Sequence, residues 1–207
     1  HIKFFNSTAY RQTYIALYEM NEIRTKYFID RKEWRKWLET NFKTANDVWL
    51  EYPLTKTGKK RILYNDAVEE ALCFGWIDST VKSLNKETTI QRFCKRRKNS
   101  TFSQPNIERL KWLYKNNLIH NSINDEVLRI IQQEFIFPED ILNELKSDKS
   151  VWKNYQNFSE PYKRIRIAYI DSARKRPDDF TKRLNHFIEK TKGNKLIKGF
   201  GGIDKYY

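Results

Sequence analysis

The most informative hydrophobic pattern in the chain lies over residues 67–72. Four apolar residues recur there at positions i, i+1, i+4 and i+5, the spacing of a two-column stripe on one face of a helix. Glu69 and Glu70 fall between them on the polar face. Gly75 follows where the pattern stops, and glycine suits the left-handed turn after a helix. Because the segment from Trp76 onward has β character, this stretch predicts a helix, a tight turn and a strand.

Further elements are predicted on both sides of this unit. A helix is expected to begin at Asp30, a good N-cap residue, and to carry an aromatic face over residues 34–42. Residues 47–52 alternate apolar and polar side chains as a strand does. Residues 88–93 alternate as well, and pairing them with residues 76–84 gives a β-hairpin.

The second half of the chain has the period of helices throughout. Serine, aspartate and proline residues are typical of helix starts, and they recur at intervals of one helix length. Residues 120–136 are predicted to be a helical or irregular connection, and Gly193 is expected to end the last helix. Helix starts are predicted at Ser103, Pro138, Ser147–Asp148, Ser159 and Pro177. The inner column of the helix after Ser159 is predicted to be Ile165, Ala168, Tyr169 and Ser172.

These elements predict an α+β protein, with a small antiparallel sheet covered by helices and then an all-helical C-terminal module. The strands are too few for a doubly wound sheet. We expect an N-terminal extension over residues 1–26, helical by the spacing of its tyrosines, and an α+β domain over residues 27–119. A helical domain over residues 120–193 follows. The tail, residues 194–207, is expected to be extended and flexible or to pack through its tyrosines.

Several of these segments resemble one known family. The run Ala67–Ser79 reads AVEEALCFGWIDS and is followed by Lys82-Ser83-Leu84 and by Gln91-Arg92-Phe93. Together they resemble the bacterial YdeI/OmpD-associated, or bacteriocin-protection, proteins, and the serine, tyrosine and arginine residues after Ser159 resemble the helical C-terminal domain of that family. The resemblance implies a non-enzymatic stress or bacteriocin-protection factor that acts by binding. It identifies a family and leaves the ligand open.

The charge balance favours an anionic partner. Forty Lys and Arg residues stand against 26 Asp and Glu residues, a formal net charge of +14, and the sequence pI is about 9.6. Such an excess suits nucleic acid, phospholipid headgroups or an acidic protein, although a lysine-rich solvated surface gives the same number. No stretch approaches the roughly 18 apolar residues of a membrane span. With two cysteines and no hydrophobic signal segment, we expect a cytoplasmic protein, whereas the family name hints at an envelope role.

A strip of cations and aromatic residues follows the second strand of the hairpin. Residues 92–98 contain five cations, Arg92 and Lys98 included, and no acid, and Phe93 and Phe102 flank most of them. Cations interleaved with aromatic rings suit single-stranded nucleic acid, the alternative function; a solvated basic loop is the plain explanation. Asp78 either serves the site or has a structural role, accepting backbone hydrogen bonds or pairing with Arg92. The expected ligand-binding residues are Trp76, Asp78, Lys82, Arg92, Phe93, Arg96, Arg97 and Phe102.

Motifs for catalysis or metal binding are missing from the sequence. The three histidines are far apart, and neither HExxH nor a paired CxxC occurs, so no metal site and no cofactor are predicted. Cys73 has no visible base partner, and adjacent Glu69 and Glu70 point in different directions on a helix. We therefore predict no catalytic residue. An enzyme with a pocket around Trp76, Asp78 and Arg92 is the third and weakest interpretation.

Overall fold

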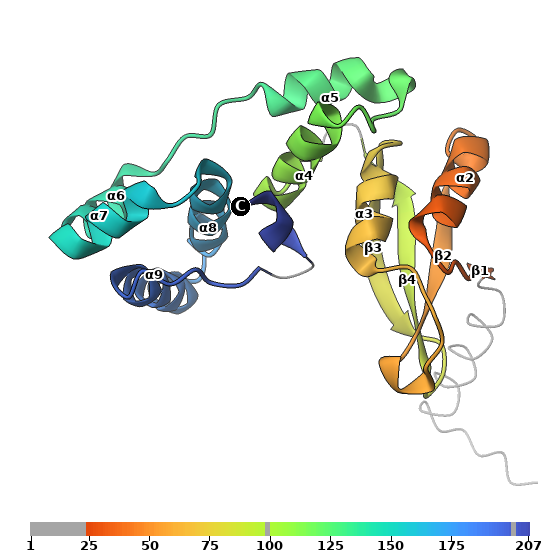
Figure 1. Ribbon diagram of the computed structural model, residues 1–207, viewed down its shortest axis with the longest axis horizontal. Coiled ribbons are helices and arrows are strands. Elements are labelled where there is room, and N and C mark those ends of the chain that lie inside the picture. The colour runs from red at the N-terminus through yellow and green to blue at the C-terminus, as the bar shows by residue number, and fades with distance from the viewer. Residues whose placement is uncertain (1–23, 98–99, 200–201) are drawn as a thin grey trace, which may run out of the picture. The chain divides into compact units, whose positions relative to one another are not determined.

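The computed structural model describes residues 24–97, 100–199 and 202–207 (Figure 1). The chain divides into two compact units, His1–Lys98 and Asn99–Tyr207. In the described residues, the first unit contains all four strands and the second contains only helices and turns. The predicted fold class, α+β followed by an all-helical part, is therefore confirmed.

The first unit is a four-stranded sheet with two α-helices among its described residues. The strand order is β1-β2-β4-β3. β4 pairs antiparallel with both β2 and β3, and the β3–β4 pair is the predicted hairpin. The helix predicted in the N-terminal extension lies, up to residue 23, outside the described residues. The elements are β1 (Thr25–Lys26), α2 (Arg31–Asn41), β2 (Asp47–Pro53), the 3₁₀ turn η1 (Thr55–Thr57), α3 (Tyr64–Leu72), β3 (Trp76–Ser83) and β4 (Thr88–Lys95).

The sheet is mixed because of its shortest strand. β1 runs parallel to β2, with Thr25 opposite Trp49 and Lys26 opposite Leu50. The predicted antiparallel pairing holds for the other three strands. A two-residue strand is too short to show an alternating pattern, so β1 could not be predicted from the sequence.

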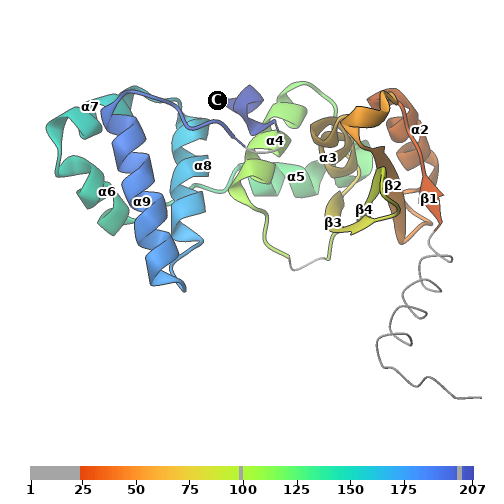
Figure 2. The same ribbon diagram turned by 90° about the horizontal axis from the view of Figure 1, so that it is seen from below.

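Alternation along the strands places the core of the first unit on one face of the sheet. Val48, Leu50 and Tyr52 of β2 point to the same face and are buried. Phe93 of β4 lies opposite Val48, and its ring centroid is 5.5 Å from that of Trp34 on α2. Both ribbon views draw α2 and α3 on the same side of the sheet (Figures 1 and 2). The face with Phe93 is therefore the one that the helices cover.

The start of α2 has the predicted N-cap. The Asp30 carboxylate accepts hydrogen bonds from the backbone N–H groups of Lys32 (2.9 Å) and Glu33 (3.1 Å). Glu33 reaches back and accepts from the N–H of Ile29 at 3.0 Å. Reciprocal bonds of this kind satisfy N–H groups that a helix start leaves without partners.

The turn between α3 and β3 requires glycine, as predicted. Gly75 has φ +73°, in the left-handed region, and its N–H donates to the carbonyl of Leu72 at 3.2 Å. β3 begins at the next residue, Trp76. At the other end, α3 begins after Leu63, which provides no side-chain cap. The turn is thus specified by one residue, whereas the start of α3 is left without a side-chain cap.

The second unit contains six α-helices in its described residues. Asp148 caps α7 by accepting from the N–H groups of Ser150 (2.8 Å) and Val151 (3.2 Å), and Ser159 caps α8. These caps and the start of α9 at Pro177 confirm the predicted helix starts. The elements are α4 (Gln104–Lys115), η2 (Asn121–Ile123), α5 (Asn124–Ile131), α6 (Glu139–Lys146), α7 (Lys149–Asn157), α8 (Glu160–Asp171), α9 (Pro177–Lys192) and η3 (Ile203–Tyr206).

The core of the second unit differs from the predicted packing of α8. Tyr169 was expected to face inward, but 53% of it is exposed, and Ser172 is exposed as well. The helix turns a neighbouring column inward because it packs against both α4 and α9. The main cluster joins residues of α6 to α9: Ile141, Leu145, Val151, Tyr155, Tyr162, Ile167, Ile170, Leu184 and Phe187.

The division of the chain into units differs from the predicted domain boundary at residues 119–120. Helix α4 contacts α5, α8 and η3, so it belongs to the compact unit that begins at Asn99. The tail of the second unit packs through its tyrosines: the rings of Tyr207 and Tyr162 meet edge-on at 4.9 Å, and Tyr206 is buried. The second of the two expectations for the tail is thus the one observed.

Candidate functional site

The residues predicted to bind a ligand do not lie on one surface. In the register of β3 and β4, Asp78 faces Phe93 and Lys82 faces Ile90. Phe93 points toward the helices, and Ile90 and Arg92 alternate with it toward the opposite face. The predicted set is therefore divided between the two faces of the sheet.

Two aromatic residues of the predicted site are part of the core. Trp76 and Phe93 are both 0% exposed. The indole N–H of Trp76 donates to the carbonyl of Phe42 at 3.2 Å, and its ring meets that of Trp37 edge-on at 5.9 Å. The prediction that Phe93 stacks on a nucleic-acid base was wrong, because the strand alternation turns its ring into the core.

Asp78 has a structural partner, but not the one considered. Its carboxylate accepts a hydrogen bond from the Tyr64 hydroxyl at 2.8 Å, which links β3 to the first turn of α3. Arg92 instead pairs with Asp47 across the sheet, with Nε of Arg92 2.7 Å from Oδ2 of Asp47. Asp78 and Arg92 lie on opposite faces of the sheet, so an ion pair between them cannot form.

On the face of the sheet that α2 and α3 do not cover, Lys82 and Arg92 lie beside one aromatic side chain. That side chain was not predicted from the sequence. Trp49 is half-buried and lies opposite Arg92 in the register. The ammonium of Lys82 lies 5.5 Å from the Trp49 ring centroid. Alternation with buried Val48 and Leu50 could have identified Trp49, since it must point to the other face.

The remaining predicted residues follow β4. The backbone N–H of Arg96 donates to the carbonyl of Gly75 at 3.0 Å, and its side chain is half-buried. Arg97 is exposed. Phe102 is half-buried and belongs to the second compact unit, whereas the arginines belong to the first. The proposed strip is thus not one surface of a single unit.

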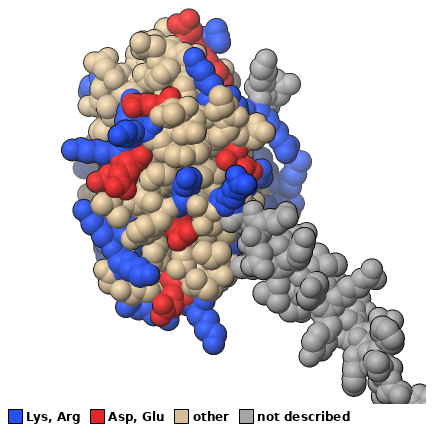
Figure 3. Space-filling view, turned by 90° about the vertical axis from the view of Figure 1, so that its right-hand side faces the viewer, with Lys and Arg blue, Asp and Glu red and all other residues tan. Residues whose placement is uncertain are grey.

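Lys and Arg residues are mixed with acids on the first unit. On the face drawn in Figure 3, Lys and Arg side chains and Asp and Glu side chains are scattered among one another over a surface of other residues. Several cations also have acidic partners in the structure, as Arg92 has Asp47. The net charge therefore does not gather into a single patch on this face.

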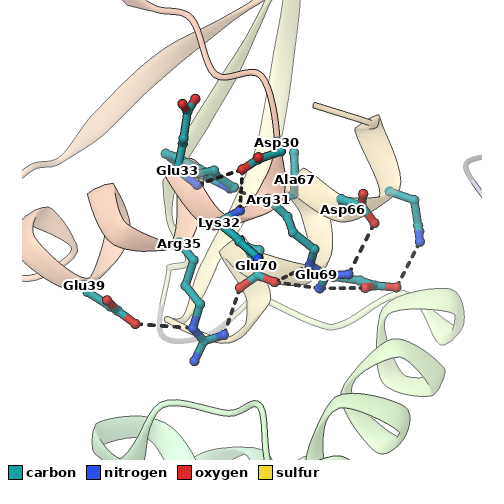
Figure 4. Close-up of polar contacts among 12 residues, drawn as sticks. Asp30, Arg31, Lys32, Glu33, Arg35, Glu39, Asp66, Ala67, Glu69 and Glu70 are labelled. Carbon is teal, nitrogen blue, oxygen red and sulfur yellow. Dashed lines mark hydrogen bonds and ion pairs between the residues drawn. The ribbon is translucent and has the colours of Figure 1, made fainter. Parts of the chain in front are cut away.

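Glu69 and Glu70 of α3 accept hydrogen bonds from two arginines of α2 (Figure 4). Arg31 donates to Glu70 (2.6 and 2.8 Å) and to Glu69 (3.1 Å), and Arg35 donates to Glu70 (2.8 Å). Glu69 and Glu70 are 0% and 3% exposed, so these bonds compensate carboxylates that have lost most of their water. Asp66 at 3.4 Å completes the group around Arg31.

These contacts change the acid–base chemistry of the group. Burial opposes the charge of Arg31, but the hydrogen bond and charge of Glu70, with Glu69 and Asp66, raise the pKa of Arg31 above its usual value. Burial and the charge of Glu70 raise the pKa of Cys73 to about 12. Cys73 is therefore a neutral thiol at physiological pH, a poor nucleophile. The charged group serves to join α2 to α3.

The helical unit uses its arginines in a similar way. Arg166 donates to the carbonyl of Ile197 and to the Tyr207 hydroxyl (2.7 Å), and Arg174 donates to Asp140 (2.8 Å). Within the described residues, no group of three or more His, Cys, Asp or Glu side chains could hold a metal ion. The described helices also include none that is long and apolar enough to cross a membrane.

Two family models match the chain. Residues 134–194, which include α6 to α9, match the family described as "Bacteriocin-protection, YdeI or OmpD-Associated". These residues are similar to a YdeI/OmpD-associated domain. The resemblance read from the sequence is confirmed for these residues. Residues 26–126 match a domain of unknown function (DUF8412), and the run Ala67–Ser79 lies within that match. No curated protein and no solved structure is significantly similar to the chain.

Proposed function

We propose that the protein is a bacterial protection factor that acts by binding, in defence against a bacteriocin, an antimicrobial peptide or a related stress. The observation that carries the proposal is the match of residues 134–194 to a family whose description names bacteriocin protection. The family is a guide to the role only, so the binding mode has to be argued from the side chains.

The side chains that were candidates for catalysis in the sequence make structural contacts instead. Glu69 and Glu70 are tied to Arg31 and Arg35, Asp78 accepts from Tyr64, and Cys73 is a buried neutral thiol. A binding role fits these side chains better than a reaction does.

Within the YdeI/OmpD-associated domain, one exposed aromatic residue is held against a cation. The guanidinium of Arg183 on α9 lies 3.9 Å from the ring centroid of Tyr169 on α8, and it donates to the carbonyl of Tyr169 at 2.7 Å. Exposed aromatic–arginine pairs are common centres of protein recognition. We propose that this pair contacts the partner.

The test is survival of a bacteriocin-sensitive bacterium that expresses the protein. We expect improved survival with the natural chain and loss of most of it with the double variant Tyr169→Ala, Arg183→Ala. The matched control is Arg176→Ala, which breaks an exposed ion pair with Asp179 on the same helix. Equal survival with and without the natural chain, for a panel of bacteriocins, would refute the protection role.

A second candidate function is single-stranded nucleic-acid binding, and the arrangement of Trp49, Lys82 and Arg92 on the sheet favours it. We expect a labelled oligonucleotide to bind the chain, and Trp49→Ala with Lys82→Glu to weaken binding at least about tenfold and to flatten its salt dependence. Anisotropy titrations at low and near-physiological salt measure both. Affinity that is unchanged in the double variant would contradict this function.

A further inference from the structure

Two polar side chains in the first unit are buried without a hydrogen-bond partner among the described residues. Tyr52 is 5% exposed and its hydroxyl oxygen has no partner; Gln91 is 6% exposed and its side-chain nitrogen has none. Native proteins pair nearly all such groups, so two in one small sheet call for an explanation. Neither is needed for the pairing of the strands, which uses the backbone.

The two side chains are neighbours on the face of the sheet that α2 and α3 cover. In the register of β2 and β4, Leu50 lies opposite Gln91 and Tyr52 lies opposite Thr89. Tyr52 and Gln91 are therefore diagonal neighbours, within reach of one small molecule. On the other side of β4, Gln91 lies opposite Val81, beside the bulge that follows Asp78.

Polar and charged side chains nearer the surface lie close to Tyr52. The guanidinium of Arg61 lies 5.5 Å from the Tyr52 ring centroid. Tyr64, 39% exposed, donates its hydroxyl to one oxygen of Asp78 at 2.8 Å, and both residues are close enough to act electrostatically on Tyr52. The Tyr64–Asp78 hydrogen bond therefore lies on the solvent side of the cluster formed by Tyr52, Gln91, Tyr64 and Asp78.

The protonation of these groups defines what they can bind. Burial raises the pKa of Tyr52 above its usual value, and the neighbouring Tyr64 adds to this, so the phenol keeps its proton at every physiological pH. The hydroxyl of Tyr52 and the amide of Gln91 are thus two hydrogen-bond donors, and Asp78 is an acceptor beside them. A planar amide presents the complement, a carbonyl oxygen next to an N–H group.

We propose that Tyr52, Gln91 and Asp78 form a binding site for a small uncharged molecule that carries an amide group. Its carbonyl oxygen accepts from Tyr52 and Gln91, and its N–H donates to Asp78. It enters where the Tyr64–Asp78 hydrogen bond opens. Asp78 and Asp66 outnumber Arg61 among the charges that act on Tyr52, which disfavours anions.

The experiment titrates the ¹⁵N-labelled full chain with acetamide and uracil, which are uncharged amides, and with acetate. We expect acetamide or uracil to give saturable shifts at Gln91, including its side-chain amide, and acetate to give none. Fragments of this size bind weakly, so the titration extends to roughly 100 mM. Tyr52→Phe, which removes a single oxygen, should weaken binding about tenfold, the effect of one lost hydrogen bond.

A second measurement separates binding from a structural role. Thermal unfolding without probe should be unchanged or raised in Tyr52→Phe, because the hydroxyl has no partner to lose, while a bound probe stabilises only the natural chain. Tyr155→Phe, at a buried tyrosine of the helical unit, is the matched control and should bind as the natural chain does. The absence of saturable shifts means that internal water alone pairs these groups, and equal binding by Tyr52→Phe means that the probe binds elsewhere; either result overturns the proposal.

Discussion

At the residue scale, the first unit depends on a few side chains that hold charge away from water. Glu70 receives three hydrogen bonds from Arg31 and Arg35 while it is 3% exposed. A carboxylate in this position is stable only with its partners, and each arginine needs it in return. The pair Glu69-Glu70, which reads in the sequence as the polar face of a helix, is thus an internal connection between two helices.

Glu70→Ala should lower the free energy of unfolding by about 2–3 kcal/mol, because it removes the carboxylate and leaves Arg31 and Arg35 partly buried without it. Urea unfolding measures the change. Glu39→Ala is the control: Glu39 pairs with Arg35 at the surface, so about 0.5 kcal/mol or less is expected. Similar losses in the two variants would show that burial does not strengthen the Glu70 contacts.

The two cysteines should differ in reactivity. Cys73 is buried with its pKa raised to about 12, whereas Cys94 is half-buried. We expect a maleimide or disulfide reagent at pH 8 to modify Cys94 first and Cys73 only on unfolding. Because the thiol of the unfolded chain has the ordinary pKa of 9.0, the buried Cys73 should also lower stability as the pH rises above 9. Peptide mass spectrometry after timed labelling tests the order, and faster labelling of Cys73 would contradict it.

At the element scale, helix ends are set by single residues whose roles differ. Gly75 has φ +73° after α3, whereas Gly193 after α9 has no positive φ and the left-handed position there belongs to Asn194 (φ +50°). The prediction that Gly193 ends α9 is confirmed as to position, since it is the C-cap residue. Its glycine character is not required there.

Gly75→Ala should therefore destabilise the protein by about 1 kcal/mol, since the side chain has to adopt a left-handed backbone. A Cβ at Gly193 meets its nearest atom, the carbonyl oxygen of Lys190, at 3.6 Å, an ordinary contact, so Gly193→Ala should be neutral or slightly stabilising. Thermal unfolding of the two variants makes the comparison. A larger loss from Gly193→Ala than from Gly75→Ala would contradict it.

At the scale of the whole molecule, ionised carboxylates on the helical unit set the response to acid. Hydrogen bonds lower the pKa of Asp148 (from Lys192 and Ser150), of Asp140 (from Arg174) and of Asp179 (from Arg176). Burial of Glu108 opposes its charge, but hydrogen bonds from Arg164 and Gln104 lower its pKa overall. All four carboxylates belong to the second unit.

Since these carboxylates titrate at lower pH in the folded than in the unfolded chain, their contribution is complete above their unfolded values of 3.8 and 4.5 and is lost as the pH falls below them. We expect stability to be nearly constant from about pH 8 to 5 and to fall below about pH 4.5. Circular dichroism melts across this range measure it, and Glu108→Gln should flatten part of the fall. A protein whose stability rises on acidification would exclude this account.

Local patterns in the sequence determined the elements. The alternation in residues 47–52 and 88–93, the Asp30 cap, the glycine at position 75 and the spaced helix starts each act over a few residues, so they can be read from the chain directly. The charge balance and the scarcity of histidine followed from composition alone. The resemblance to the YdeI/OmpD-associated family likewise rests on short runs of residues that are neighbours in the sequence.

Only the tertiary structure decided which side chains act together. Phe93 and Arg92 are adjacent in the sequence, yet strand alternation sends one into the core and the other to Asp47. The parallel strand β1, the Trp49–Lys82 contact and the buried Tyr52–Gln91 cluster each join residues far apart along the chain. Such contacts depend on how elements pack, which local propensity does not encode. The candidate sites therefore emerged from packing, and the elements from sequence.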